Sequence, residues 1–184
     1  MKRLFLPLAI LSIVITVGCG SSNVAVSPEQ QKIVDDMIEA REFRIENDWA
    51  NPLMTTSMAQ LANSGLMAPG NNIQRVSLIG NPNFLEVKGD SVKADLPYFG
   101  ERQRGAGYDT DGNGIKFEDK VTDMDVSYNN SKNRYDIKFS AKRKTEIFNI
   151  IINVFGNGSS AISINSSDRN NIRYDGKIMP IPEK

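Results

Sequence analysis

Apolar and polar residues alternate with a period of two through much of this chain, and the pattern is sharpest around Gly89-Asp90. Leu85 and Val87 share one face before this pair, and Val92, Ala94 and Leu96 share one face after it. Glycine reaches a positive φ without steric cost, so Gly-Asp suits a two-residue hairpin turn. Pro97 has no N–H to donate to a ladder, so regular pairing should end there. The pattern predicts a β-hairpin over residues 84–96.

The same alternation predicts further strands on both sides of the hairpin. Apolar positions recur in this way at residues 43–51, 76–79, 115–117, 124–128, 135–141, 162–164 and 172–178. Residues 147–155 are apolar on both faces apart from Asn149 and Asn153, which is typical of a central strand. Short connections between successive strands imply antiparallel pairing.

Helical spacing of apolar residues is clearest before the first of these strands. Ser27 is placed to cap a helix, Pro28 suits its first position, and Gln30 completes a capping box. Apolar residues then recur at helical spacing through about Arg41. A second, short helix is predicted over residues 58–62. The expected fold class is α+β: an N-terminal helix packed on a curled, mainly antiparallel, meandering β-sheet of about eight strands.

The first 18 residues form a segment of a different kind. Lys2 and Arg3 precede an apolar run over residues 4–17, interrupted by few polar side chains. The run is too short for a comfortable membrane span and is typical of a secretory signal peptide. We therefore expect residues 1–18 to be removed from the mature protein.

The apolar run is followed by Cys19, which is the single cysteine of the chain. A lone cysteine after a small residue resembles the lipobox of bacterial lipoproteins, although Thr16 stands where an aliphatic residue is usual. The resemblance implies acyl chains, such as palmitate, on Cys19; the alternative is a secreted protein with an unmodified thiol. We expect a lipidated tether over residues 19–26 and a single α+β domain over residues 27–184.

The charge and the histidine content narrow the class of protein. The 22 basic side chains less Lys2 and Arg3 leave 20, against 22 acidic ones, so the mature chain has a net charge of −2. This balance argues against a nucleic-acid partner. The chain has no histidine, which excludes Ser-His-Asp and Cys-His catalysis and imidazole metal sites. We predict no cofactor.

The loop after the hairpin carries the candidate binding residues Tyr98, Phe99, Arg102, Arg104 and Tyr108. Neighbouring side chains of a strand face opposite sides, so we expect one of the two adjacent aromatic rings in the core and the other at the surface. Aromatic faces beside guanidinium groups can hold an acidic or sugar-like ligand or the surface of a partner. The alternative is that the aromatic pair only plugs a sheet edge or the helix contact.

A second candidate site follows in the same loop. Asp109, Asp111 and Asn113, followed by Gly114, match the first half of an EF-hand calcium loop. Lys120 stands where the bidentate acidic ligand would be needed, and no predicted helix flanks the loop. The sequence therefore favours a plain turn cluster, with calcium binding as the alternative.

Five segments of the chain occur in the same order in a group of Bacteroidetes proteins. They are residues 35–43, 89–100, 114–117, 128–135 and 172–176. In these segments the chain resembles the family known as domain of unknown function 4251, and it departs from it at residues 51–82 and 109–114. The resemblance covers nearly all of the mature chain and implies a lipoprotein, but it implies no activity.

Two functions are compatible with these observations. The first is a lipid-anchored cell-envelope protein, a non-enzymatic binding or structural module on the periplasmic side of the outer membrane. Its partners would be the membrane, through the anchor, and an envelope protein or a glycan. The alternative is a glycan-acting hydrolase that uses paired carboxylates. The lack of histidine and of a catalytic motif favours the first, so we expect no enzyme activity.

Overall fold

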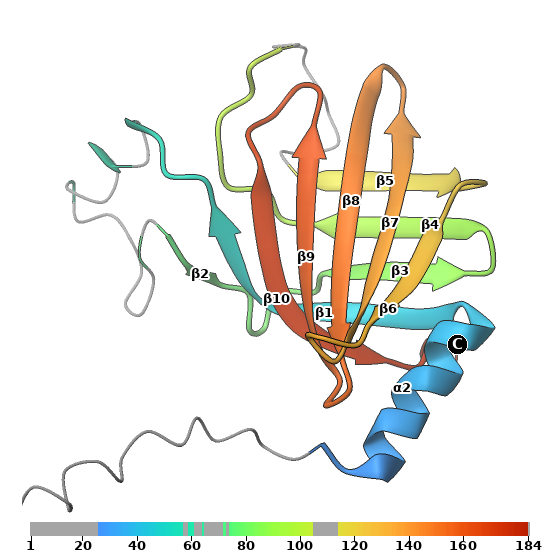
Figure 1. The fold of residues 1–184 in the computed structure, drawn as a ribbon. Coiled ribbons are helices and arrows are strands. Elements are labelled where there is room, and N and C mark those ends of the chain that lie inside the picture. Colours follow the sequence, from blue (N-terminus) through green and yellow to red (C-terminus); the bar gives the residue numbers. More distant parts are fainter. Residues whose placement is uncertain are drawn as a thin grey trace, which may run out of the picture.

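The structure is a computed structural model that describes residues 26–56, 59–60, 64, 72, 74–104 and 114–183. Within these residues the chain forms a helix and ten strands (Figure 1). In chain order they are α2 (Pro28–Ala40), β1 (Glu42–Pro52), β2 (Val76–Ser77), β3 (Phe84–Lys88), β4 (Ser91–Leu96), β5 (Ile115–Lys120), β6 (Asp125–Asn129), β7 (Arg134–Arg143), β8 (Glu146–Phe155), β9 (Ser159–Ser166) and β10 (Ile172–Met179). The predicted signal peptide, Cys19 and most of the predicted helix at 58–62 lie outside the described residues. No helix in the described part of the chain combines the length and hydropathy needed to cross a membrane.

The strands form one antiparallel sheet in the order β5-β4-β3-β1-β10-β9-β8-β7-β6, with β2 paired to β1. The predicted hairpin is confirmed, because β3 pairs with β4 around a turn in which Gly89 has a φ of 62°. Antiparallel pairing between chain neighbours is also confirmed throughout β6 to β10. The sheet has ten strands rather than about eight, and the protein is mainly β.

Strand β1 joins the two halves of the curled sheet. Residues 42–45 of β1 pair with β3, whereas residues 44–52 pair with β10. Strands β3 to β5 cross behind β7 and β8 (Figure 1), and side chains of both halves belong to one core cluster. The result is a half-barrel whose interior is filled by side chains of the sheet itself.

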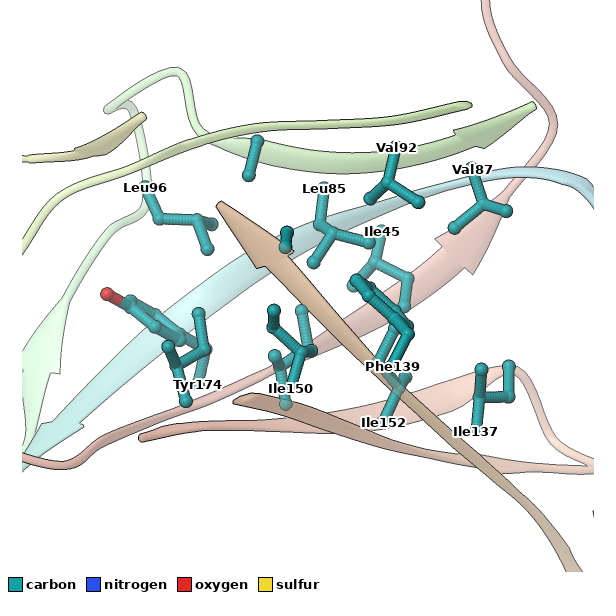
Figure 2. Packing of buried hydrophobic residues seen from close by; sticks show 14 of the residues in the cluster. Ile45, Leu85, Val87, Val92, Leu96, Ile137, Phe139, Ile150, Ile152 and Tyr174 are labelled. Carbon is teal, nitrogen blue, oxygen red and sulfur yellow. The ribbon is translucent and has the colours of Figure 1, made fainter. Parts of the chain in front are cut away.

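The core consists of alternate side chains from both halves, as the period-two pattern requires. Figure 2 shows side chains of β3 and β4 opposite those of β7 and β8, among them Leu85, Val87, Val92, Phe139, Ile150 and Ile152. The Phe117 and Phe148 rings stack with centroids 5.4 Å apart. Truncating one such buried side chain to alanine costs about 2–5 kcal/mol. The core thus joins the two halves and stabilises the curl.

Helix α2 lies at one end of the half-barrel and not under the whole sheet (Figure 1). Its buried side chains are Val34 and Ile38, which join the core cluster at its margin. The expected packing of this helix on the sheet is therefore found at one end of the sheet only, because a two-residue apolar stripe is too narrow to cover the whole concave face. Pro28 does occupy the start of the helix, but Ser27 makes no side-chain capping bond. Gln30 instead donates a hydrogen bond to the Asn157 carbonyl oxygen.

Strand β8 is central in the sheet, as predicted, but only one of its faces is covered. The side chains of Phe148, Ile150 and Ile152 point into the core, while Ile147 and Ile151 are 45% and 38% exposed. The apolar outer positions of this strand therefore do not indicate burial on both faces.

A bulge in β1 is covered by a side chain instead of a strand. The register of β1 against β10 shifts between Asn47 and Trp49, and β1 has no strand neighbour on its other side at Asn47. The buried Asn83 amide fills the gap: its Oδ1 accepts from the Asn47 N–H at 3.1 Å, and its Nδ2 donates to the Asn47 carbonyl at 2.9 Å. Opposite the bulge, Gly176 allows a close approach, because a Cβ there would lie 2.1 Å from the Glu46 carbonyl oxygen. Asn83 and Gly176 together accommodate the irregular part of β1.

Candidate functional site

The loop that carries the predicted binding residues packs against the loop between β9 and β10. The Gln103 N–H donates to the Asp168 carbonyl at 2.8 Å, and the Asn170 N–H donates to the Glu101 carbonyl at 3.2 Å. The Tyr98 hydroxyl donates to the carbonyl oxygens of both Glu101 and Asn170, each at 3.1 Å. These bonds fix residues 97–104 on the body of the protein.

A buried ion pair lies under these two loops. Arg169 contacts Glu146 through Nε, at 2.8 Å, and through a terminal nitrogen, at 3.2 Å. The two side chains are only 2% and 8% exposed. Ser166 donates a hydrogen bond to the same carboxylate at 2.6 Å, and Arg102 reaches it at 3.3 Å. The charges of Arg169 and Glu146 are thus paired, as burial requires.

The candidate residues of this loop are largely engaged within the protein. The Tyr98 ring lies 5.2 Å from the Arg169 guanidinium carbon, and burial raises the pKa of its hydroxyl. Tyr98 and Phe99 are both half-buried against the core cluster, so the expected division between core and surface is not found. The reason is that Pro97 ends the strand, and regular alternation ends with it. Arg104 is exposed, and its N–H donates to the Asp168 carbonyl.

The remaining candidates in this region lie outside the described residues. They are Tyr108 and the calcium candidates Asp109, Asp111 and Asn113. Among the residues that the structure does describe, no three or more acidic side chains gather as a metal site would need. The role of residues 98–108 as a ligand-binding surface therefore stays a prediction.

A second surface, which the sequence pattern did not reveal, lies between α2 and the β6–β7 hairpin. It is a groove of about 540 Å³, here called the helix–hairpin groove, and it is lined by Val26, Pro28, Gln31, Asp35, Tyr128, Asn133 and Tyr135. Tyr128 and Tyr135 form a register pair across β6 and β7, so both rings reach the same face of the sheet. Their centroids are 4.8 Å apart in an edge-to-face arrangement.

Asp35 links the helix to the hairpin inside this groove. Its Oδ1 accepts a hydrogen bond from the Tyr135 hydroxyl at 2.8 Å and another from Gln31 Nε2 at 2.7 Å. Burial, followed by the hydrogen bond and the negative charge of Asp35, raises the pKa of Tyr135 to about 12. Tyr135 therefore stays protonated and donates to Asp35 at neutral pH.

The groove is held in shape by tight packing of the first turn of α2. Gln31 lies against Gly156 in the β8–β9 turn so closely that a Cβ at Gly156 would overlap its Oε1. On the other wall, Asn133 adopts a left-handed backbone with φ of 49°, and its Oδ1 accepts from the Tyr128 hydroxyl. The side chains of the groove are thus positioned by contacts made before any ligand arrives.

The chemistry of the groove suits binding better than hydrolysis. Among its described lining residues Asp35 is the single carboxylate, whereas glycosidases ordinarily use two. Two aromatic rings, amides and a carboxylate at the rim of an open hollow are the groups that fix the orientation of a small polar ligand. Nothing in the geometry of these residues activates a nucleophile.

The fold and the groove define a mainly β half-barrel with a polar, aromatic-sided surface hollow. The chain belongs to the family described as Domain of unknown function (DUF4251), whose model matches residues 25–178. The crystal structure of a DUF4251 family protein from Bacteroides eggerthii DSM 20697 is similar, with a TM-score of 0.57 and 14% sequence identity over 85% of this chain and 91% of that chain. At this identity the likeness shows the fold alone. No curated protein matches the chain. The family resemblance of the sequence is thereby confirmed.

Proposed function

We propose that this chain is a lipid-anchored cell-envelope protein that faces the periplasm at the outer membrane and binds a ligand or partner without catalysing a reaction. The observation that carries the binding role is the helix–hairpin groove, with side chains held in place before binding. The anchoring rests on the signal-like segment and on Cys19.

The position of the groove supports the two parts of the proposal together. Val26 lines the groove and stands seven positions after Cys19. A fully extended tether of that length spans at most about 25 Å, so an acylated Cys19 would hold the groove close to the membrane surface. The ligand would then be a component of the envelope rather than a solute of the medium.

Fractionation of cells that produce the full chain tests the anchor. The Cys19→Ser variant should leave the membrane fraction, or accumulate unprocessed, and should lose labelling by an alkyne-tagged palmitate analogue. Ser21→Ala, two positions further on, is the matched control and should behave as the wild type. Membrane retention and labelling that persist in Cys19→Ser would refute lipidation at this residue.

Photo-crosslinking tests the binding role. A photoreactive amino acid replaces Lys132, in the β6–β7 turn beside the groove, or Ile79, which is 73% exposed in the turn after β2. A discrete adduct from position 132 and none from position 79 is the expected result. Equal adducts from both positions, or none, would contradict a binding role for the groove. Sugar release when the purified protein is incubated with envelope glycans would contradict the non-enzymatic assignment.

A further inference from the structure

Tyr128 provides a flat apolar surface in the helix–hairpin groove. The side chain is 40% exposed, although the edge contact with Tyr135 and the hydroxyl bond to Asn133 keep the ring in place. A ring that is already ordered loses little conformational entropy when a ligand stacks on it. The groove therefore offers a preformed stacking surface.

Two polar groups of the groove keep unused hydrogen-bonding capacity. Asp35 Oδ1 already accepts two hydrogen bonds, but Oδ2 accepts none from the described residues. Asn133 Oδ1 accepts from Tyr128, and in the described part of the chain no acceptor is paired with its Nδ2. One carboxylate acceptor and one amide donor therefore remain for a ligand.

We propose that the helix–hairpin groove binds a neutral saccharide; this deepens the binding function proposed above and rests on it. A sugar hydroxyl both donates and accepts, so neighbouring hydroxyls can use Asp35 and Asn133 together. The C–H face of the sugar ring packs against Tyr128.

Other small-ligand chemistries fit these groups less well. An amine would engage Asp35 and the ring but would leave the Asn133 donor unused. A phosphate or carboxylate ligand would meet the negative charges of Asp35 and Glu39, which both act on Tyr135. A neutral polyol is the ligand class that uses all three groups without charge repulsion.

Saturation-transfer difference NMR and titration calorimetry on the full chain test this inference. The protein is kept in a detergent without a sugar head group, and the probes are cellobiose, maltose and N,N′-diacetylchitobiose, with choline as the amine comparison. Tyr128→Ala removes the stacking ring. Asn133→Gly removes the amide while keeping a residue that tolerates the left-handed backbone. Ile151→Ala, at a similarly exposed apolar residue on the outer face of β8, is the matched control.

We expect at least one disaccharide to bind and choline not to. Tyr128→Ala and Asn133→Gly should each weaken that binding by about tenfold, the factor that corresponds to one good contact. Ile151→Ala should leave it unchanged, and the thermal melts of all three variants should show a folded protein. Failure of every disaccharide, an unchanged affinity in Tyr128→Ala, or binding of choline alone would overturn the saccharide assignment. If the saccharide assignment fails but the photo-crosslinked adduct at position 132 is still obtained, the binding function stands and the ligand class is wrong. If no saccharide binds and no adduct forms at position 132, the proposed binding function fails too.

Discussion

The Asn83 side chain substitutes for a missing strand, and its removal should destabilise the protein far more than an ordinary loop substitution. Asn83 is 5% exposed and makes three hydrogen bonds to Asn47: to its N–H, its carbonyl and its amide Nδ2, at 3.1, 2.9 and 2.9 Å. Asn47 is 3% exposed, so water cannot readily replace these bonds. At about 1 kcal/mol for each bond, Asn83→Ala should cost about 3 kcal/mol, and more if the Asn47 groups stay unpaired.

Urea-induced unfolding of the full chain measures this loss as a lower transition midpoint at an unchanged m-value. Asn81→Ala is the matched control, because Asn81 is exposed in the same loop and only its backbone carbonyl contacts Asn83. The control should lose less than about 0.5 kcal/mol, as surface substitutions do. A loss in Asn83→Ala no larger than in Asn81→Ala would refute the view that this amide satisfies the bulge.

Two further substitutions test other parts of the fold. Gly176→Ala should lower the free energy of unfolding by about 3 kcal/mol, because the new Cβ would meet the β1 backbone. Gly80 has a φ of 83° and open space around it, so Gly80→Ala should cost only about 1 kcal/mol in the same urea assay. Equal losses would contradict the close approach. The pKa of Tyr135 is raised from 10.0 to about 12 in the folded protein. The stabilisation of the folded state by the protonated Tyr135 hydroxyl is therefore complete below pH 10 and is lost as the pH rises toward 12. Wild-type stability should therefore fall more steeply across this range than that of Tyr135→Phe, and parallel curves would exclude the shift.

The strands were predictable because their burial pattern has a period that local sequence reveals. Leu85, Val92 and Phe139 all lie where alternation places them. The sequence also indicates that Glu146 is buried, because it lies two residues before Phe148 and so points to the same inner face of β8. Nothing in the sequence identifies Arg169 as its partner. A lone acidic residue at an inward position predicts a buried pair without identifying the second member.

The curl of the sheet and the helix–hairpin groove could not be derived in the same way. The groove depends on the contact between Asp35 and Tyr135, which are 100 residues apart in the chain. The Tyr128–Tyr135 pair could have been predicted from the sequence, because both residues flank one short turn and are opposite each other in the hairpin register. The curl arises where β1 passes from β3 to β10, and alternation along β1 contains no information about which strands flank it.

The place of β1 between the two halves of the sheet has a consequence for how the chain folds. Strands β3 to β5 and β6 to β10 form from chain neighbours, but β1 meets β10 only when the last strand is available. Closing so long a loop is entropically costly and slow compared with forming a hairpin. Until that closure, the inner faces of both halves are exposed, and such partly built sheets are prone to aggregate. A nascent or translocating chain therefore cannot enclose its core until its C-terminal strand has emerged, so loss of β10 should abolish folding rather than shorten the sheet by one strand.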